Sequence, residues 1–344
     1  MAPEITTIIP TFRRPRLLKR AIRSVLAQNY DAFQICVYDN GSGDDTSAVV
    51  AEFAREDSRV GYYCHSSNIG AWNNFKYGID RVSTPYFNLL SDDDALLPGF
   101  FETATHALES HPAAGLFAGA TVRFGQSFIA TPVVRWPERF YPAPLGFMEI
   151  LRRDFPDWNA ILFRQSALSR VGSIDVSFEH GIDLDFICRY AVNCGMIVCP
   201  VPYAILTLGH DHLSKQLYSP AIHASHWLRI LDRYEFAPWI DSEAREAFAS
   251  ARAWIGRKIL KNAIDAAAAS QNTQALAAAA CLKESFALSR APLLLTLMTA
   301  DSVLGETLRG AYRSLHSLVR AIRSPIQFYL HKHDIRSVTA ALTL

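Results

Sequence analysis

Three consecutive aspartates, Asp92, Asp93 and Asp94, directly follow the apolar run 86–90, which is typical of a buried strand. Neighbouring carboxylates repel one another, so a buried strand seldom ends this way without a counter-charge. Mg²⁺ or Mn²⁺ would supply that charge, because both prefer oxygen ligands and leave coordination sites open for a phosphate. The cluster therefore predicts a metal-dependent site. The alternative is a solvated acidic turn before the helix that we expect near Pro98.

The segments around this cluster predict the sheet that would hold it. Runs of β-branched and aromatic residues alternate with amphipathic helical runs. The expected strands are 5–9, 33–38, 60–64, 86–90, 115–119 and 122–124, and the first expected helices are 15–26, 46–56 and 75–82. Pro10 is expected to end the first strand. This alternation predicts a mainly parallel sheet with helices on both faces, in which ligands bind beyond the carboxyl ends of the strands.

Polar residues follow each of the first three strands. Thr11 comes after the first, Asp39 after the second, and Asn68 and Gly70 after the third. Because these strand ends share one edge, we expect the polar residues to gather near the aspartates. Arg13 is the arginine placed to meet a phosphate, whereas most of the other basic residues of this loop and the following helix are expected to be solvated. For Asp39 the alternative is an Asx-turn.

Five motifs in this order resemble family two glycosyltransferases of the GT-A fold. They are Ile-Ile-Pro-Thr-Phe at Ile8–Phe12, Ser-Val-Leu-Ala-Gln at Ser24–Gln28, Asp-Asn-Gly-Ser at Asp39–Ser42, Asn-Ile-Gly at Asn68–Gly70, and Ser-Asp-Asp-Asp-Ala-Leu-Leu-Pro at Ser91–Pro98. A weaker match extends through Val171–Asp175 and Asp183–Asp185 to about residue 215. The resemblance implies an α/β, Rossmann-like GT-A fold and an inverting transfer from a nucleotide-sugar donor.

The resemblance also implies which residues hold the nucleotide. The positions carried over are Pro10, Thr11, Phe12, Arg13, Asp39, Asn68, Gly70, Asn74 and Asp92. The backbone of Pro10 and Thr11 and the carboxylate of Asp39 would hold the base and ribose. A carboxylate suits a base edge because it can accept a hydrogen bond from an N–H such as that of uracil or guanine.

The triple aspartate matches the family's metal motif with one departure, Ser91, where a first Asp often stands. The resemblance makes Asp93 the direct ligand of Mn²⁺ or Mg²⁺ and Asp94 a second ligand or a support, and these roles could shift by one residue. His210 would complete the metal shell or donate to the diphosphate, with His212 as the other candidate. A surface histidine without a role is the alternative.

Asp183 corresponds to the family's general base, which deprotonates the acceptor hydroxyl. Ile182 stands where family members often have Glu, and this departure weakens the assignment. The alternative for Asp183 is a helix N-cap, because a helix is expected to continue to about Asn193. Asp185 and Arg189 are four residues apart and are expected to form an ordinary helix pair.

The Pro- and aromatic-rich segment 131–145 is expected to be an ordered loop. In the resembling family, this region shapes the acceptor pocket. Trp158 is the candidate acceptor-binding residue, with Trp136 and Tyr141 as further platforms on which a sugar could stack. The alternative is that these aromatic side chains belong to the core.

The chain has 344 residues, of which 50% are hydrophobic, and a formal net charge of +1. This length allows two domains, and near-neutrality gives no general attraction to nucleic acid. No apolar run reaches the roughly 20 residues of a membrane span, and we expect a cytoplasmic protein with reduced thiols. We predict a GT-A domain at 1–218, with a nucleotide-binding half at 1–111 and an acceptor half at 112–218, followed by a helical region at 219–344.

The segment 305–344 carries six Lys or Arg residues against two acidic residues. Leu308, Tyr312, Leu315 and Val319 have the spacing of one helical face, which predicts a basic amphipathic helix. Such a helix could lie on an anionic membrane surface, which would make the protein peripheral. The preferred alternative is packing on its own domain or on another subunit.

We expect an inverting, metal-assisted glycosyltransferase with a UDP-, GDP- or dTDP-linked donor and a saccharide or lipid-linked acceptor. By resemblance, its setting would be bacterial surface polysaccharide or glycoconjugate synthesis. A sugar-phosphate nucleotidyltransferase is a second reading, although 10–15 lacks the glycine-rich loop that such an enzyme needs. A non-catalytic nucleotide-sugar-binding scaffold is a third reading. The acidic residues at Asp39, at Asp92–Asp94 and at Asp183 together disfavour it.

Overall fold

The computed structural model describes residues 2–125, 128–130, 136–152, 156–208, 220–286, 294, 296, 298–300 and 304–314. These residues form two compact units. The first contains the described residues up to 150 and those from 156 to 208, and the second contains the helices from 220 onward. The predicted boundary at 218/219 lies outside the described residues and stays a prediction.

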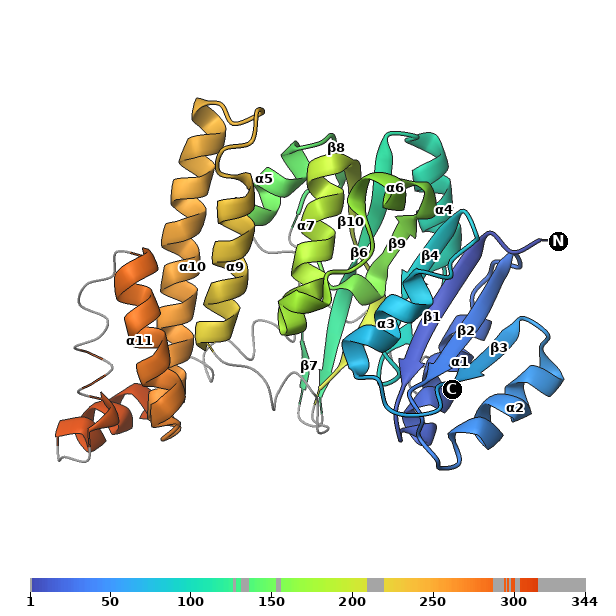
Figure 1. The fold of residues 1–344 in the computed structure, drawn as a ribbon, viewed down its shortest axis with the longest axis horizontal. Coiled ribbons are helices and arrows are strands. Elements are labelled where there is room, and N and C mark those ends of the chain that lie inside the picture. Colours follow the sequence, from blue (N-terminus) through green and yellow to red (C-terminus); the bar gives the residue numbers. More distant parts are fainter. Residues whose placement is uncertain are drawn as a thin grey trace. The chain divides into compact units, whose positions relative to one another are not determined.

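The first unit begins with the alternation that the sequence predicts (Figure 1). Its first elements are β1 (Ile5–Thr11), α1 (Pro15–Leu26), β2 (Phe33–Asp39), α2 (Thr46–Glu56), β3 (Val60–Cys64), α3 (Ala71–Ile79) and β4 (Tyr86–Leu89). The next are β5 (Ala95–Leu96), α4 (Phe100–Ser110), β6 (Ala114–Gly125), β7 (Phe128–Ala130), β8 (Arg139–Tyr141) and α5 (Leu145–Arg152). The last are η1 (Trp158–Ala160), β9 (Ile161–Arg164), η2 (Gln165–Ala167), α6 (Leu168–Val171), η3 (Val176–Gly181), α7 (Ile182–Asn193) and β10 (Gly195–Thr207).

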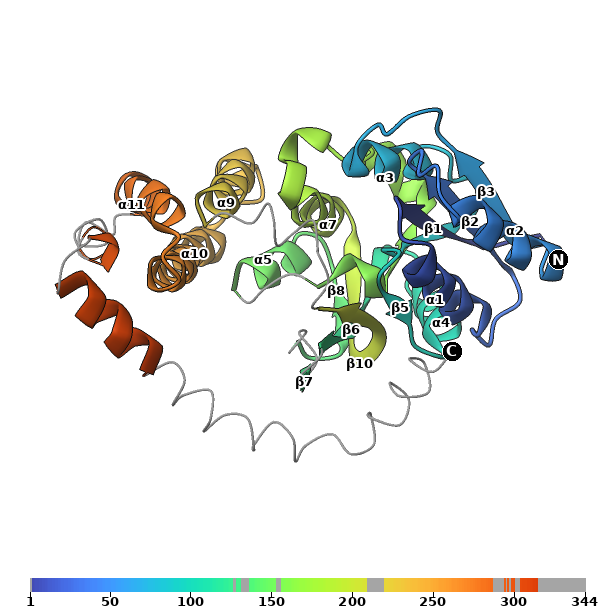
Figure 2. The ribbon, with the colours of Figure 1, turned by 90° about the horizontal axis from the view of Figure 1, so that it is seen from below.

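The strands form one mixed sheet in the order β3-β2-β1-β4-β9-β6-β10-β5, with β7 paired to β6 and β8 to β10. The strands β3, β2, β1 and β4 are parallel, and β9 runs antiparallel to its neighbours β4 and β6. The helices α3 and α7 lie on one face, and α1 and α4 lie on the other (Figure 2). The predicted α/β fold with helices on both faces is confirmed.

The first strand runs past its expected end. The sequence predicts that Pro10 ends it, yet β1 pairs with β2 through Pro10 and Thr11. The carbonyl of Ile8 accepts from Leu90 N at 3.0 Å, so Ile8 turns its backbone toward β4, and the ladder with β4 ends there. Pro10, two residues on, turns its nitrogen to the same side. The prediction is wrong because the N–H that proline lacks has no partner strand to pair with at that position.

Both faces of β1 are packed against helices. Ile5 and Ile9 belong to the core cluster that contains Leu18 of α1. Ile8 points to the opposite face, where a Cβ built on Gly78 of α3 would lie 2.6 Å from Ile8 Cγ2. Glycine at this position therefore lets α3 lie directly against β1.

Two polar side chains of α1 hold the segment that follows the triple aspartate. Ser24 Oγ accepts from Leu96 N at 3.0 Å. Gln28 Nε2 donates to Leu97 O at 2.9 Å, and Gln28 Oε1 accepts from Phe100 N at 3.1 Å. Ser24 and Gln28 are both buried, so these bonds fix β5 and the start of α4 against α1.

Two expectations about the middle of the chain need correction. The sequence predicts two strands at 115–119 and 122–124, whereas the structure has the single strand β6. The glycine at 119 does not interrupt it, because Tyr203 of the paired strand β10 occupies the space that a side chain would fill. The proline-rich segment contains a short strand, β8, which pairs with β10. Residues 131–135 of that segment lie outside the described residues.

The second unit contains the helices α9 (Pro220–Tyr234), α10 (Ser242–Ala268) and α11 (Asn272–Phe286), and a helical stretch at 304–314. Asp241 caps α10 by accepting from Ala244 N at 2.8 Å. Trp227, Ile255 and Ile259 are fully buried in its core. The expected helical C-terminal region is therefore present in the described part of the chain. None of the helices described there is both long and apolar enough to span a membrane.

The basic residues described in 304–314 contact their own helical unit. Arg309 Nη1 donates to Ala300 O at 3.3 Å, and Arg313 Nη1 donates to Ala268 O at 3.1 Å, at the end of α10. Tyr312 donates to Asp265 at 2.7 Å. For these residues the structure shows the preferred alternative, packing on the same region, and cations near a helix C-terminus are favourable there.

Candidate functional site

The three aspartates lie on the turn between β4 and β5. Asp94 N donates to Ser91 O at 3.1 Å and closes this turn. The exposed fractions of Asp92, Asp93 and Asp94 are 5%, 6% and 1%. Three carboxyl groups this buried need partners that offset their charge, which excludes the alternative of a solvated acidic turn.

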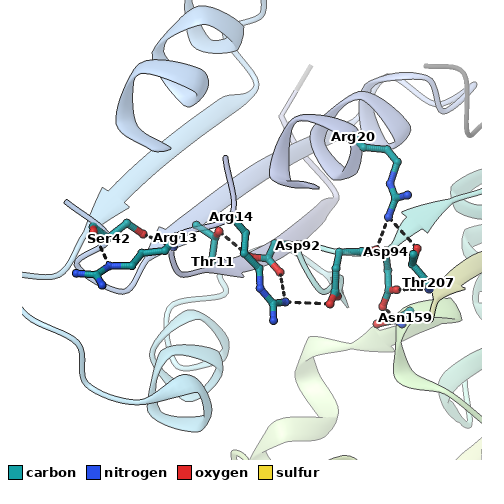
Figure 3. Close-up of polar contacts among 10 residues, drawn as sticks. Thr11, Arg13, Arg14, Arg20, Ser42, Asp92, Asp94, Asn159 and Thr207 are labelled. Carbon is teal, nitrogen blue, oxygen red and sulfur yellow. Dashed lines mark hydrogen bonds and ion pairs between the residues drawn. The ribbon is translucent and has the colours of Figure 1, made fainter. Parts of the chain in front are cut away.

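One partner comes from the end of β1. Thr11 Oγ1 donates to Asp92 Oδ2 at 2.7 Å. A second comes from the residue before α1, since Arg14 Nη1 lies 3.3 Å from Asp92 Oδ1 and 2.9 Å from Asp93 Oδ2 (Figure 3). Residues about 80 positions apart therefore meet at the carboxyl ends of the neighbouring strands β1 and β4.

Burial dominates the electrostatics of Asp92. Burial first, and then the charge of Asp93, raise the pKa of Asp92 to about 6. The positive charge of Arg14 and the hydrogen bond from Thr11 act in the opposite direction. Arg14 therefore offsets only part of the negative charge of the acidic turn.

Asp94 points away from Arg14 into a separate network. Asp94 Oδ1 accepts from Thr207 N at 2.8 Å, and Oδ2 accepts from Asn159 Nδ2 at 2.6 Å. Burial and the charge of Asp93 raise the pKa of Asp94 well above its usual range. Arg20 of α1 donates to Thr207 Oγ1 at 2.8 Å and to the carbonyl of Asp93. Asp94 thus joins the turn to β10 and η1, which fits the supporting role that the sequence leaves open for it.

Arg13 lies elsewhere. It has a positive φ of 55° and is exposed, and it donates to the Ser42 carbonyl from Nε at 3.2 Å. Its guanidinium lies 5.1 Å from the ring centre of Phe12. Figure 3 shows Arg13 beside Ser42 and Arg14 beside Asp92. Among the other arginines, most of which are expected to be solvated, Arg14 and Arg20 instead contact the acidic turn.

Asp39 ends β2 and is 2% exposed. Its Oδ1 accepts from Ser42 N at 2.9 Å and from Ser42 Oγ at 2.6 Å. Its Oδ2 accepts from the hydroxyl of Tyr62 on β3 at 2.7 Å. The turn considered as the alternative reading is therefore present, and Asp39 keeps its place at the carboxyl edge of the sheet beside β1.

The next loop is fastened to the residue after Asp39. Asn40 Nδ2 donates to Asn68 Oδ1 at 2.8 Å, and Asn40 Oδ1 accepts from Ile69 N at 2.8 Å. Asn68 Oδ1 also accepts from Gly70 N, and Gly70 has a φ of 88° that suits glycine. The segment 68–70 therefore lies beside the end of β2, and its role in a donor pocket stays a prediction.

Two predicted ligand-binding residues are buried in internal contacts. Asn74 is 1% exposed; its Nδ2 donates to Tyr38 O at 2.8 Å, and its Oδ1 lies 3.0 Å from His65 Nε2. Trp158 is 9% exposed, and its ring centre lies 4.6 Å from that of Phe75. Their binding roles stay predictions, and as described here both side chains contribute to packing.

Asp183 and Asp185 behave differently within the first turn of α7. Asp185 is fully buried and forms the expected pair with Arg189, with Oδ2 2.8 Å from Nε. Asp183 is half-buried, and its Oδ1 accepts from Leu184 N at 2.7 Å. The N-cap of α7 is Gly181, so Asp183 is not the cap. This leaves its predicted role as a base, which stays a prediction. His210 and His212 lie outside the described residues.

The carboxylates suit a hard divalent cation by their chemistry. Asp92 and Asp93 are adjacent oxygen donors, and both already attract the cationic group of Arg14. In the part of the chain that the structure describes, no group of three or more His, Cys, Asp or Glu residues is arranged around one metal position. A cation here would therefore bind two carboxylates and take its other oxygen ligands from a phosphate or water.

The sequence missed several residues of this site. Arg14, Arg20, Asn159 and Thr207 come from four places in the chain and share only their contact with the acidic turn. The one available signal was local, because Arg14 directly precedes Pro15 at the start of a helix whose amino end faces the strand ends. Nothing in the sequence distinguishes Asn159 or Thr207 from other polar residues.

Residues 6–172 match the family described as Glycosyl transferase family 2. The match begins in β1 and covers the acidic turn, Asp39 and the 68–70 loop. Residues 6–172 belong to glycosyl transferase family 2. A relative of this glycosyltransferase domain is the GalNAc(5)-diNAcBac-PP-undecaprenol beta-1,3-glucosyltransferase of Campylobacter jejuni, which is 36% identical over 102 residues. That alignment covers 29% of this chain and 33% of the relative, so it spans about a third of either protein.

Solved structures of similar fold cover more of the chain than the family 2 domain. TarS 1-349 of S. aureus in complex with UDP-GlcNAc has a TM-score of 0.65 at 15% identity, with 90% of this chain and 92% of that chain covered. The mannosyltransferase PcManGT of Pyrobaculum calidifontis, in complex with GDP-Man and Mn²⁺, has a TM-score of 0.55 at 16% identity, with 92% and 88% covered. At these identities the likeness establishes the GT-A fold.

Proposed function

We propose that this chain is an inverting glycosyltransferase that moves a sugar from a nucleotide-sugar donor to a hydroxyl of a saccharide or lipid-linked acceptor. Membership of glycosyl transferase family 2 supports the reaction class. The similar structures of TarS and PcManGT were solved with UDP-GlcNAc and with GDP-Man, which supports the kind of donor. The relative from Campylobacter jejuni is named for an undecaprenol-linked acceptor, which supports the lipid-linked option.

The observation that carries this proposal is the meeting of Thr11, Arg14, Asp92 and Asp93 at the carboxyl ends of β1 and β4. This edge is where ligands bind in open α/β sheets. In this buried acidic turn, Arg14 is shared by two of the three carboxylates, so the turn can take further positive charge. A cation bound with a diphosphate would supply that charge together with its ligand. Asp39 and the 68–70 loop lie at the same edge of the sheet.

In the proposed site, Asp93 binds the divalent cation, Asp92 lies toward the ribose, and Asp94 holds the turn in place. The cation, Mn²⁺ or Mg²⁺, supplies charge that stabilises the leaving nucleoside diphosphate. Arg14 lies 2.9 Å from Asp93 and is close enough to turn toward the diphosphate once the cation takes over the carboxylates. His210 is a further candidate for the metal or the diphosphate.

Asp183 is the proposed general base. Inversion needs one carboxylate that accepts the proton of the acceptor hydroxyl while its oxygen attacks the anomeric carbon from the face opposite the diphosphate. Asp183 fits because it is half-buried at the start of α7, whereas its neighbour Asp185 is fully buried and paired with Arg189. Trp158 is kept as the candidate acceptor platform.

We propose that the reaction belongs to bacterial surface polysaccharide or glycoconjugate synthesis on the cytoplasmic side. The protein would be peripheral to the membrane or form a homo-oligomer. The undecaprenol-linked acceptor in the name of the Campylobacter jejuni relative supports the glycoconjugate part of this proposal. We propose no nucleic-acid partner, because a net charge of +1 gives no general attraction to nucleic acid.

The test is donor turnover. Purified protein is incubated with UDP-, dTDP- and GDP-sugars, with Mn²⁺, with Mg²⁺ and with EDTA, and release of the nucleoside diphosphate is followed. The proposal expects metal-dependent release that Asp183→Asn removes. Donor binding without turnover would indicate a scaffold, and pyrophosphate release from a nucleoside triphosphate and a sugar phosphate would indicate a nucleotidyltransferase.

A further inference from the structure

A second arginine, Arg20 of α1, lies at the acidic turn and contacts it differently from Arg14. Its Nη2 donates to the backbone carbonyl of Asp93, and the same nitrogen donates to Thr207 Oγ1 at 2.8 Å. Figure 3 shows Arg20 beside Asp94 and Thr207, away from Arg14. Arg14 pairs with carboxylates, whereas Arg20 holds the backbone of the turn.

The surroundings of Arg20 differ from those of a solvated surface arginine. The side chain is half-buried, and burial lowers its pKa, while the charges of Asp94 and Asp93 act in the opposite direction. Among the described residues, its buried Nε has no hydrogen-bond partner. A buried donor without an acceptor is destabilising. The two bonds of Nη2 are therefore kept although Nε loses the water that it would bind at the surface.

The carbonyl that Arg20 binds belongs to the peptide group between Asp93 and Asp94. The side chains on either side of this peptide group have different partners. Asp93 Oδ2 lies 2.9 Å from Arg14 Nη1, and Asp94 Oδ1 accepts from Thr207 N at 2.8 Å. Rotation of the peptide group changes ψ of Asp93 and φ of Asp94, which are the angles that place these two residues relative to each other. The bond from Arg20 therefore restrains how the two carboxylates are directed.

Thr207, at the end of β10, completes this connection. Its backbone N–H donates to Asp94 and its hydroxyl accepts from Arg20, so one residue holds both the arginine and the turn. Thr207 is buried, as is the turn itself. The helix α1, the acidic turn and β10 are therefore joined at one buried point.

We propose that Arg20 is a positioning residue, which holds the carboxylate of Asp93 in the direction in which it binds the cation. This inference rests on the proposed function, in which Asp93 is the metal ligand. Residues that orient a metal ligand without touching the metal typically contribute roughly 10- to 100-fold to metal affinity. Arg20 acts in this way through the backbone of the turn.

The alternative is that Arg20 acts only as a positive charge beside the aspartates. Any side chain of the same charge could then replace it, because a charge alone has no requirement for a fixed geometry. A positioning residue instead needs the length and the planar geometry of the guanidinium, which lysine lacks. Substitutions that keep the net charge therefore separate the two roles.

The experiment is a titration of the full chain with Mn²⁺, in which free Mn²⁺ is followed by electron paramagnetic resonance. Arg20→Lys keeps the charge but has a shorter side chain that cannot hold both oxygens, and it should lower Mn²⁺ affinity by about tenfold. Thr207→Val keeps the N–H that binds Asp94 and removes only the hydroxyl, so it should lower the affinity by about threefold. The double variant should bind no more weakly than Arg20→Lys alone, because both changes break the same connection.

Arg16→Lys, at an exposed position in the first turn of α1, is the matched control and should leave Mn²⁺ affinity unchanged. If Arg20 only supported the fold, Arg20→Lys would lower the free energy of unfolding and leave the Mn²⁺ affinity of the folded protein as it is. Affinity within about twofold of wild type in Arg20→Lys overturns this inference alone. Absence of Mn²⁺ binding in the wild type overturns the metal role in the proposed function as well. If Arg20→Lys does not fold, Thr207→Val decides.

Discussion

Arg14 Nη1 lies 2.9 Å from Asp93 Oδ2 and 3.3 Å from Asp92 Oδ1, so one guanidinium is shared by two adjacent buried carboxylates. A divalent cation that binds these oxygens must compete with Arg14 or displace it. The nucleotide-free protein and the donor complex should therefore differ in the partner of Arg14. This relationship leads to the first prediction.

Arg14→Gln should raise the affinity of the nucleotide-free protein for Mn²⁺ by about tenfold, because it removes a positive charge next to the ligand oxygens. Free Mn²⁺ can be followed by electron paramagnetic resonance during a titration. Arg16→Gln, a change of equal charge at an exposed position in the first turn of α1, is the control and should have a much smaller effect. Unchanged or weaker Mn²⁺ binding in Arg14→Gln would show that Arg14 does not compete with the cation.

Substitutions should distinguish Asp93, as a metal ligand, from Asp94, as a structural residue. Asp94→Asn should lower the free energy of unfolding by about 1–3 kcal/mol. Asp94 accepts hydrogen bonds from two N–H groups, and the NH₂ group of an asparagine would face one of them and could not accept. Asp93→Asn should lower Mn²⁺ affinity with a smaller effect on unfolding. Chemical denaturation without metal, together with the Mn²⁺ titration, measures both quantities. Equal effects of the two changes on both quantities would refute the division.

Asp183→Asn should reduce kcat by about 10²- to 10⁴-fold, the usual range for loss of a general base. Binding of the nucleoside diphosphate should not change, because Asp183 is not proposed to touch it. Asp185→Asn provides the contrast, because it breaks the ion pair between the fully buried Asp185 and Arg189 and should reduce stability by about 3–5 kcal/mol. Wild-type turnover in Asp183→Asn would remove this residue from the mechanism.

Gln28→Leu should destabilise the first unit by about 1–3 kcal/mol, because Phe100 N and Leu97 O lose their buried partner. Denaturant unfolding gives the value. The matched change Gln271→Leu, at an exposed position, should lie within about 0.5 kcal/mol of wild type. A stability loss of the same size in the two variants would mean that the bonds of Gln28 are not what holds this segment.

The regular part of the fold could be predicted from the sequence, because strand and helix periods are local properties. The Asp185–Arg189 pair was predictable for the same reason, since four-residue spacing defines neighbours on a helix. The contact of Arg14 with the aspartates could not be predicted, because Arg13 and Arg14 both lie in a loop. The positive φ of Arg13 sets the direction of the chain in this loop, and a positive φ leaves no periodic pattern in the sequence.

The partners of Asp94 could not be predicted at all. Asn159 and Thr207 lie 65 and 113 positions away along the chain, and only the pairing of β4 with β9 and of β5 with β10 brings them to the turn. For Asn74 and Trp158, the sequence suggested binding roles but could not show that both side chains are buried. Amide and indole side chains suit both a ligand and a core, and burial decides between them only in the folded chain.

The pairing of β4 with β1 and of β5 with β10 anchors the acidic turn on both sides. The backbone thus keeps like charges together before any ligand arrives, and their mutual repulsion is carried by the resting protein. A cation that relieves this repulsion should also stabilise the fold. The melting temperature should therefore rise with Mn²⁺ concentration, and it should rise less in Asp93→Asn. In this protein, the repulsion among the aspartates and the affinity for a cation are therefore two measures of one quantity.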